Sequence, residues 1–150
     1  MSGPRRTGER STEEASVQST FLMIKPEAIG NATHGEIIDL LIKNRFRIVR
    51  LKQFRFDQAQ ARAFYAVHEG KPFFAGLMSY ITSGEVIGIE LEKEGAVELL
   101  RELVGSTDPA KARPGTIRYM YGTDLQHNAV HASDSPESAE KELAIVFPEK

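Results

Sequence analysis

The chain of 150 residues contains no cysteine, which excludes disulfides, thiolate zinc sites and cysteine nucleophiles. The absence is consistent with a reducing compartment, and we expect a cytoplasmic protein. The sequence also lacks a run of the roughly 20 apolar residues that a membrane span needs. Residues 1–19 contain no apolar segment of the signal-peptide type. We therefore predict a protein that does not associate with membranes.

The sequence has no excess of either charge. Its formal net charge is −2, so it has no general attraction to nucleic acid or to an anionic membrane, and we do not expect nucleic acid among its partners. The contents of 41% hydrophobic and 27% charged residues are those of a globular protein. A chain of this length buries about 68–70% of its unfolded surface, which is enough for one stable domain.

The N-terminal segment is poor in apolar residues. Met1–Ser19 is rich in Arg, Glu, Ser, Thr and Gly, and Val17 is its only large aliphatic residue besides Met1. Such a segment cannot bury enough surface to offset the entropy lost on ordering. We predict a mobile tail at residues 1–19 and one domain at residues 20–150.

Hydrophobic patterns predict strands and helices in alternation. Strands are expected at 21–24, at 49–52 with a break of parity near Gln53, at 86–91 and at 129–133. Helices are expected after a capping box formed by Thr33 and Glu36, and at 58–68, 72–81, 97–104 and 136–144. This order favours an α/β sandwich in which helices cover an antiparallel sheet. Residues 106–128 form a connection longer than a simple link between two elements needs, and loops of this length are often functional.

The usual glycine-rich phosphate-binding motifs are absent. Gly70-Lys71 is followed by Pro72 instead of the Ser or Thr of a P-loop, and the sequence contains no GxGxxG turn. A nucleotide site in this chain would therefore depend on cationic side chains.

Four histidines are available for chemistry: His34, His68, His127 and His131. None belongs to the two-histidine helical motif of zinc proteases. His127 and His131 are four residues apart, but their segment lacks a helical pattern, so we do not expect them to share a metal. A single histidine without context is more often a surface or capping residue than a catalyst.

His131 differs from the other three histidines in its surroundings. In an extended segment Val130 and Ala132 face the core, whereas His131 and Ser133 share the opposite face. A neutral imidazole held on a strand at the end of a long loop is a good nucleophile toward phosphorus near pH 7. Glu142, on the following helix, is a candidate to fix the tautomer of the ring.

The segment 128–135, Asn-Ala-Val-His-Ala-Ser-Asp-Ser, resembles the active-site signature of nucleoside diphosphate kinases. Further resemblances to that family lie at 21–27, 64–65, 71–77, 105–110, 113–118 and 138–142. One such match would be weak, but these occur together in the family's order and spacing from about residue 20 to 147. The resemblance implies a ferredoxin-like fold with a four-stranded antiparallel sheet. It also implies transfer of the γ-phosphate of ATP to nucleoside diphosphates by a ping-pong mechanism, in a tetramer or hexamer of identical chains.

The resemblance also implies catalytic roles. His131 would be the phosphorylated nucleophile, Glu142 would hold the far nitrogen of its ring, and Ser133 would lie nearby. Tyr65 would support Lys25 and the phosphate site. Mg²⁺ would be held mainly by the phosphates of the nucleotide, without a metal ligand from the protein.

The nucleotide-binding roles follow in the same way. The residues implied to contact phosphates are Lys25, Arg101, Thr107 and Arg118. Lys25 and Asn128 would also contact the sugar hydroxyls, and Phe73 would stack on the base without reading it, which explains tolerance of many bases. Phosphoryl transfer requires in-line positioning and neutralisation of charge, and these cations provide the second.

The chain departs from the family at several positions. Ala132 stands where Gly is usual, and Lys71 stands where many members have Arg. Tyr119 and Met120 replace a small residue and an acid. No named catalytic group is lost. Two alternatives remain open: a nucleic-acid-binding module that uses exposed aromatics on the same type of sheet, and a catalytically silent homologue.

Overall fold

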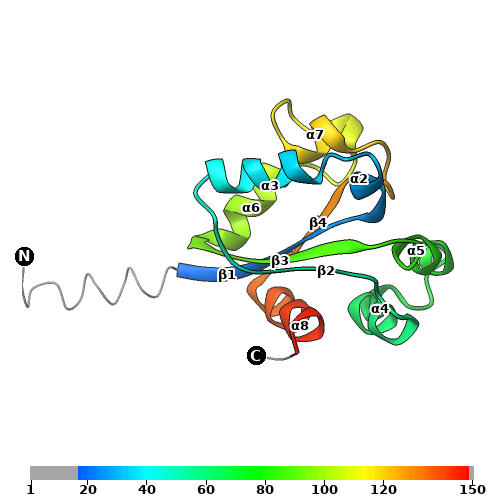
Figure 1. Ribbon diagram of the computed structural model, residues 1–150. Helices are drawn as coiled ribbons and strands as arrows, with labels where there is room; N and C mark the ends of the chain where they lie inside the picture. Colours follow the sequence, from blue (N-terminus) through cyan, green and yellow to red (C-terminus); the bar gives the residue numbers. More distant parts are fainter. Residues whose placement is uncertain (1–16, 149–150) are drawn as a thin grey trace, which may run out of the picture.

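The computed structural model describes residues 17–148 and contains one four-stranded antiparallel sheet (Figure 1). The strands lie in the order β2-β3-β1-β4. Their bounds are Val17–Ile24 for β1, Arg47–Phe54 for β2, Val86–Glu94 for β3 and Val130–Ala132 for β4. The predicted sheet and its cover of helices are confirmed. Among the described residues no helix is long and apolar enough to cross a membrane.

Helices cover both faces of the sheet (Figure 1). One face carries α2 (Pro26–Gly30), α3 (His34–Lys43), α6 (Ala96–Val104) and α7 (Ile117–Tyr121). The other carries α4 (Gln58–Phe64), α5 (Phe74–Ile81) and α8 (Pro136–Val146). Two short 3₁₀ turns, η1 (Ala66–His68) and η2 (Pro109–Lys111), lie in the connections. The sheet is therefore the middle of three layers.

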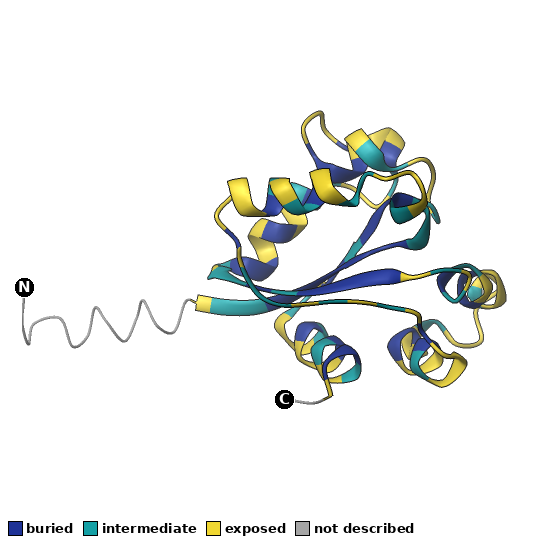
Figure 2. Cartoon of the chain, viewed as in Figure 1, coloured by how far each residue is buried: buried dark blue, intermediate teal, exposed yellow. Residues whose placement is uncertain are grey.

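The central strand β1 separates two hydrophobic clusters. Leu22 and Ile24 belong to the cluster under α3 and α6, whereas Phe21 and Met23 belong to the cluster under α4 and α8. The alternation follows from the period of two along a strand, and burial on both faces explains why the run 21–24 is continuously apolar. The burial colours in Figure 2 show this buried centre between exposed outer helix faces.

The first strand begins at Val17, four residues before the predicted start at 21. Val17 pairs with Glu94, Gln18 with Lys93 and Ser19 with Glu92, so residues 17–19 extend β1 along β3. The prediction of a tail up to Ser19 was wrong for these three residues, because hydrogen bonding to β3 orders a segment that has little apolar surface. The other residues of the predicted tail, 1–16, lie outside the described residues.

The predicted capping box at Thr33 is wrong. The backbone of Thr33 is already helical, with φ −99° and ψ −1°, and its side chain makes no cap hydrogen bond. Its hydroxyl donates instead to the carbonyl of Ala28, at 3.0 Å, because α2, which was not predicted, ends at Gly30, three residues before Thr33. A complete capping box forms at the next helix along the chain, α4, between Asp57 and Gln60.

Other boundaries differ by a few residues. The irregularity in β2 lies between Ile48 and Arg50, earlier than the predicted break near Gln53. The predicted helix at 58–68 is divided into α4 and η1, and α5 begins at Phe74 instead of Pro72. The long connection 106–128 contains η2 and α7, and α8 continues two residues past its predicted end. None of these differences changes the order of the elements.

Candidate active site

The pairing of β1 with β4 brings the two ends of the domain together. Met23 lies opposite His131, and the backbone N–H of Lys25 donates to the carbonyl of Ala129 at 2.9 Å. Lys25 is the residue directly after β1, and Asn128 is close to the start of β4. The register therefore places the lysine beside the loop that leads to the histidine, as the burial pattern of the two strands requires.

A cavity of about 610 Å³ opens at this end of the sheet. Eight of the predicted site residues line it: Lys25, Tyr65, Phe73, Arg101, Thr107, Arg118, Asn128 and His131. The other two, Ser133 and Glu142, lie behind the histidine ring. The walls of the cavity come from strands, helices and loops far apart in the sequence, so the cavity exists only in the folded chain.

His131 is held by Glu142 on α8, and Ser133 supports that glutamate. The Nε2 of His131 lies 3.0 Å from Glu142 Oε1, an ion-pair distance, although the ring N–H is not aligned on that oxygen for a regular hydrogen bond. Ser133 Oγ donates to the same Oε1 at 2.6 Å. Ser135 caps α8, since its Oγ accepts from the N–H of Ser138 at 3.1 Å. The capped helix holds the glutamate, which in turn holds one side of the imidazole.

Aromatic rings surround the other faces of His131. The ring centroid of Phe64 lies 5.1 Å away and that of Tyr65 lies 6.3 Å away. The hydroxyl of Tyr65 is buried and has no hydrogen-bond partner among the described residues. Burial and the nearby charge of Glu142 raise the pKa of Tyr65, so the phenol stays protonated. Its predicted role toward Lys25 stays a prediction, because the hydrogen bonds of Lys25 go elsewhere.

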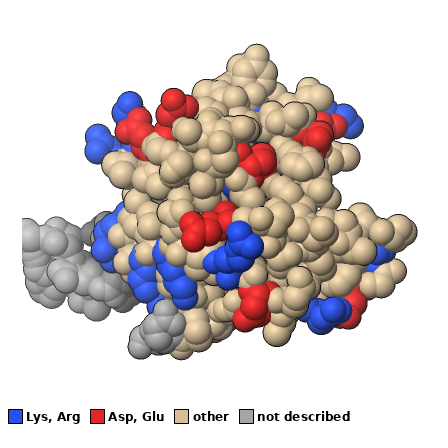
Figure 3. Space-filling view, turned by 45° about the vertical axis from the view of Figure 1, so that its right-hand side comes forward, with Lys and Arg blue, Asp and Glu red and all other residues tan. Residues whose placement is uncertain are grey.

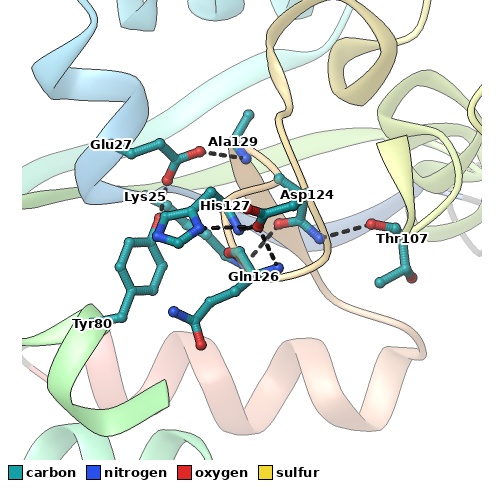
Figure 4. Close-up of polar contacts among 9 residues, drawn as sticks. Lys25, Glu27, Tyr80, Thr107, Asp124, Gln126, His127 and Ala129 are labelled. Atoms are coloured by element: carbon teal, nitrogen blue, oxygen red, sulfur yellow. Dashed lines mark hydrogen bonds and ion pairs between the residues drawn. The ribbon is translucent and has the colours of Figure 1, made fainter. Parts of the chain in front are cut away.

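Lys25 is 7% exposed and reaches into the cavity. Its Nζ donates to Asn128 Oδ1 at 2.8 Å and to the carbonyl of Gln126 at 3.4 Å (Figure 4). Burial and the charge of Arg118 lower the pKa of Lys25 to about 8, against a smaller opposite effect of Glu27. The lysine is therefore still mostly charged at pH 7 and loses its charge more easily than an exposed lysine as the pH rises.

Two arginines complete the cationic wall. Arg118 is 7% exposed, and its guanidinium donates to the carbonyls of Val130 at 2.8 Å and Gly105 at 3.1 Å. Burial and the charge of Arg101 lower its pKa to about 10, which leaves it charged at pH 7. Arg101 is exposed on α6 and donates to the carbonyl of Ala132 at 3.3 Å. Both arginines therefore lie against the strand that carries His131.

The mouth of the cavity combines a polar and an aromatic wall. Asn128 Nδ2 donates to the carbonyl of Thr107 at 3.0 Å, which ties the loop before β4 to the segment after α6. Phe73, at the start of α5, is 51% exposed. A large exposed aromatic ring at the rim of a cationic cavity is a suitable surface for stacking a planar base.

Sequence reasoning missed part of the lining. His68, Leu77, Leu125, Gln126, Ala132 and Asp134 also line the cavity. His68 lies three residues after Tyr65, so the helical spacing of these two residues was a usable signal. Gln126 acts through its backbone carbonyl, which no side-chain pattern could indicate.

The departures from the family pattern are accommodated without displacing a site residue. Ala132 is buried, and its methyl group belongs to the hydrophobic cluster under α3 and α6. Tyr119 and Met120 are exposed on α7. Lys71 is exposed in the turn before Phe73. Arg101 and Arg118 remain beside His131 despite these changes.

The chain is similar to proteins of known family. A family model described as "Nucleoside diphosphate kinase" matches residues 18–150. A nucleoside diphosphate kinase of Heliobacterium modesticaldum is 48% identical over 131 residues, which is 87% of this chain and 88% of that protein. One of Archaeoglobus fulgidus is 44% identical, with 87% of each chain covered.

Solved structures agree with this similarity. The nucleoside diphosphate kinase of Aquifex aeolicus superposes with a TM-score of 0.85 at 43% identity, covering 87% of this chain and 95% of that chain. A halophilic nucleoside diphosphate kinase of Halobacterium salinarum, in complex with CDP, gives a TM-score of 0.85 at 41% identity, with 88% of each chain covered.

Proposed function

Because the chain belongs to the nucleoside diphosphate kinase family, we propose that His131 is the nucleophile through which it transfers phosphate. The enzyme moves the γ-phosphate of ATP to nucleoside diphosphates by a ping-pong mechanism through a phosphohistidine. One observation supports the assignment of His131 above all. Its ring is braced by Glu142 on one side and faces a cavity with Lys25, Arg101 and Arg118 on the other.

The geometry favours one ring nitrogen of His131. Nε2 is buried beside Glu142, so Nδ1 is the nitrogen left to attack. The carboxylate favours the tautomer with the proton on Nε2, which leaves the lone pair of Nδ1 free. Ser133 fixes the carboxylate by its hydrogen bond to Oε1. In the first half-reaction a bond forms between Nδ1 and the γ-phosphorus while the bond to the bridging oxygen breaks, and ADP leaves. The second half-reaction reverses these steps with another nucleoside diphosphate.

The cationic residues of the cavity would bind the phosphates. Lys25, Arg101 and Arg118, with Thr107, can neutralise the charge that spreads over the transferring group. Asn128 and Lys25 would contact the sugar hydroxyls, and Phe73 would stack on the base. Stacking on a π face does not distinguish bases, so we expect broad specificity.

We propose that Mg²⁺ enters the site bound to the phosphates of the nucleotide. Among residues 17–148 no group of three or more metal-ligating side chains lies together. Asp134 is the one carboxylate that the described residues contribute to the cavity lining. The donor set therefore fits a Mg²⁺ ion carried by phosphate oxygens, where it would neutralise charge on the triphosphate.

Oligomeric state and location complete the proposal. β2 is an edge strand with Leu51 exposed on it, and Val17, Ile42 and Leu99 are also exposed. An unpaired strand edge and exposed apolar side chains both favour association with another copy, so we propose a homo-oligomer, either a tetramer or a hexamer. We also propose a cytoplasmic location, where nucleotides are available as substrates.

The observed sheet does not favour the nucleic-acid-binding alternative. The aromatic residue of the central strand, Phe21, is buried under helices instead of exposed on an open face. Phe73 lies at the start of a helix. Both signs of charge occur on the face drawn in Figure 3. The phosphotransferase function explains why cations and His131 line one cavity, whereas a nucleic-acid-binding module would not need that arrangement.

Labelling the protein with γ-labelled ATP and Mg²⁺ tests the proposed intermediate. We expect label on the protein that is labile in acid and stable in alkali, because a phosphoramidate hydrolyses in acid whereas a phosphoserine does not. Added GDP should discharge it as labelled GTP. Acid-stable label, or label that GDP does not remove, would contradict the proposal.

The dependence of kcat/KM on pH tests the role of Lys25. Since its pKa is lowered to about 8 in the free protein, its ammonium is present below pH 8 and is lost as the pH rises above it. We expect kcat/KM for nucleotide to fall above about pH 8, because kcat/KM reports groups of the free enzyme. The fall in kcat should begin at higher pH, since bound phosphate stabilises the charged lysine. A kcat/KM that stays constant to pH 9.5 would exclude this role.

A further inference from the structure

Glu27 has no role in the transfer described above, although it lies two residues after Lys25. It stands in the first turn of α2 and is partly buried. One of its oxygens, Oε2, accepts a hydrogen bond from the backbone N–H of Ala129 at 2.9 Å. The other, Oε1, accepts from the hydroxyl of Tyr80 on α5. Figure 4 shows the carboxylate between these two partners.

Ala129 has an unusual backbone. Its φ is +78°, in the left-handed region that residues with a side chain rarely adopt. Ala129 is buried, and both of its backbone polar groups are held by the segment around α2. Its N–H donates to Glu27, and its carbonyl accepts from the N–H of Lys25 at 2.9 Å. These two hydrogen bonds oppose relaxation of the strained residue.

The conformation of Ala129 sets the direction of its neighbour. Asn128 precedes it directly, and its side-chain oxygen accepts from Lys25 Nζ at 2.8 Å inside the cavity. A change of φ at position 129 would turn the chain and move Asn128 relative to Lys25. The orientation of this pair therefore depends on a hydrogen bond made outside the cavity.

Tyr80 lies on α5, the helix that follows Phe73, and links the carboxylate of Glu27 to the loop before Asn128. Its ring lies 4.7 Å from that of His127, and His127 Nδ1 lies 2.9 Å from Asp124 Oδ1. Asp124 also accepts from the backbone N–H of His127 at 2.7 Å, which closes the turn before Asn128. Tyr80 thus contacts both Glu27 and the loop (Figure 4).

We propose that Glu27, supported by Tyr80, is a positioning residue that holds Ala129 in its left-handed conformation and thereby keeps Asn128 directed at Lys25. The inference rests on the proposed function of the Lys25–Asn128 pair in nucleotide binding. Glu27 does not contact the reacting phosphate. Its charge also acts on Lys25, whose pKa it raises, so removal of the charge has an electrostatic effect as well as a positional one.

Variants at position 27 separate the two effects. Glu27→Ala removes both hydrogen bonds and the charge, and we expect kcat/KM for GDP, with ATP as donor, to fall about 10- to 100-fold, as small misplacements of binding groups do. Glu27→Gln keeps an acceptor for Ala129 but loses the charge. We expect it to retain most of kcat/KM at pH 7 and to move the decline of kcat/KM to lower pH. Tyr80→Phe should cause an intermediate loss.

A second substitution tests whether the backbone of Ala129 is the link. Glycine adopts positive φ without strain, so Ala129→Gly should change the wild-type enzyme little and should recover part of the activity lost in Glu27→Ala. The matched control is Glu98→Ala, because Glu98 is also a glutamate in the first turn of a helix, is exposed and does not line the cavity. We expect Glu98→Ala to leave kcat/KM unchanged.

The outcomes distinguish this inference from the proposed function. Wild-type protein is first labelled with γ-labelled ATP, and a phosphohistidine there establishes the function independently of Glu27. If Glu27→Ala then keeps kcat/KM within about twofold of wild type, the inference is wrong. It is also wrong if Ala129→Gly restores none of the loss although urea unfolding shows both variants to be folded.

Discussion

Replacement of His131 by alanine is expected to lower kcat by at least about 10⁴-fold, because removal of a nucleophile costs up to about 10⁶-fold in enzymes that form covalent intermediates. His68 also lines the cavity, but no carboxylate among the described residues is paired with its ring as Glu142 is with His131. Lys25 lines the cavity too, but it is held by Asn128 and Gln126. The label from γ-labelled ATP should disappear together with the turnover. Both are measured on the same preparation, with GDP as acceptor.

The control for this variant is His34→Ala. His34 is the first residue of α3 and does not line the cavity, so its loss should leave both label and turnover close to wild type. His131→Ala removes a ring that packs against Phe64 and Tyr65. Its fold must therefore be checked by circular dichroism before a loss is interpreted. A folded His131→Ala protein that still accepts label would refute the nucleophile assignment.

Replacement of Arg118 by alanine is expected to have the second largest effect, a loss of about 10²–10³-fold in kcat. This is the typical cost of removing one donor that stabilises developing charge in a transition state. Arg118 is well placed for that role because it is buried beside Val130, one residue before His131. Its removal also leaves the carbonyls of Gly105 and Val130 without a donor. We therefore expect the free energy of unfolding to fall by about 1–3 kcal/mol as well.

Arg118→Lys separates charge from geometry. Lysine keeps the positive charge but loses the planar fork that reaches two carbonyls at once, so it should restore part of kcat and less of the stability. Steady-state rates and urea unfolding on the three proteins provide both numbers. If Arg118→Ala loses stability but keeps its kcat within about threefold, Arg118 is a structural residue and the phosphate assignment fails.

Much of the site could be predicted because its parts are local in the sequence. The alternation at 130–133 placed His131 and Ser133 on one face, and the helix predicted at 136–144 placed Glu142 behind them. The apolar run 21–24 placed Lys25 at a strand end. Each of these inferences depends on a period or a cap within a few residues. The resemblance to a family then connected the separate segments.

The parts that could not be predicted depend on contacts distant in the sequence. The left-handed backbone of Ala129 is fixed by Glu27, which is 102 residues away. Residues 17–19 contain one apolar residue, Val17, but β3 supplies their hydrogen bonds. In each case a tertiary partner overrides the local preference, and no window of the sequence contains that partner.

The distance along the chain between Lys25 and Asn128 has a consequence for biosynthesis. The two residues are 103 positions apart, and they meet only when the first strand pairs with the last. The α8 helix, which braces His131, follows later still. A nascent polypeptide therefore cannot assemble its phosphate pocket until nearly all of it has left the ribosome. Premature termination anywhere before α8 would yield a product without a braced nucleophile, not a weaker enzyme.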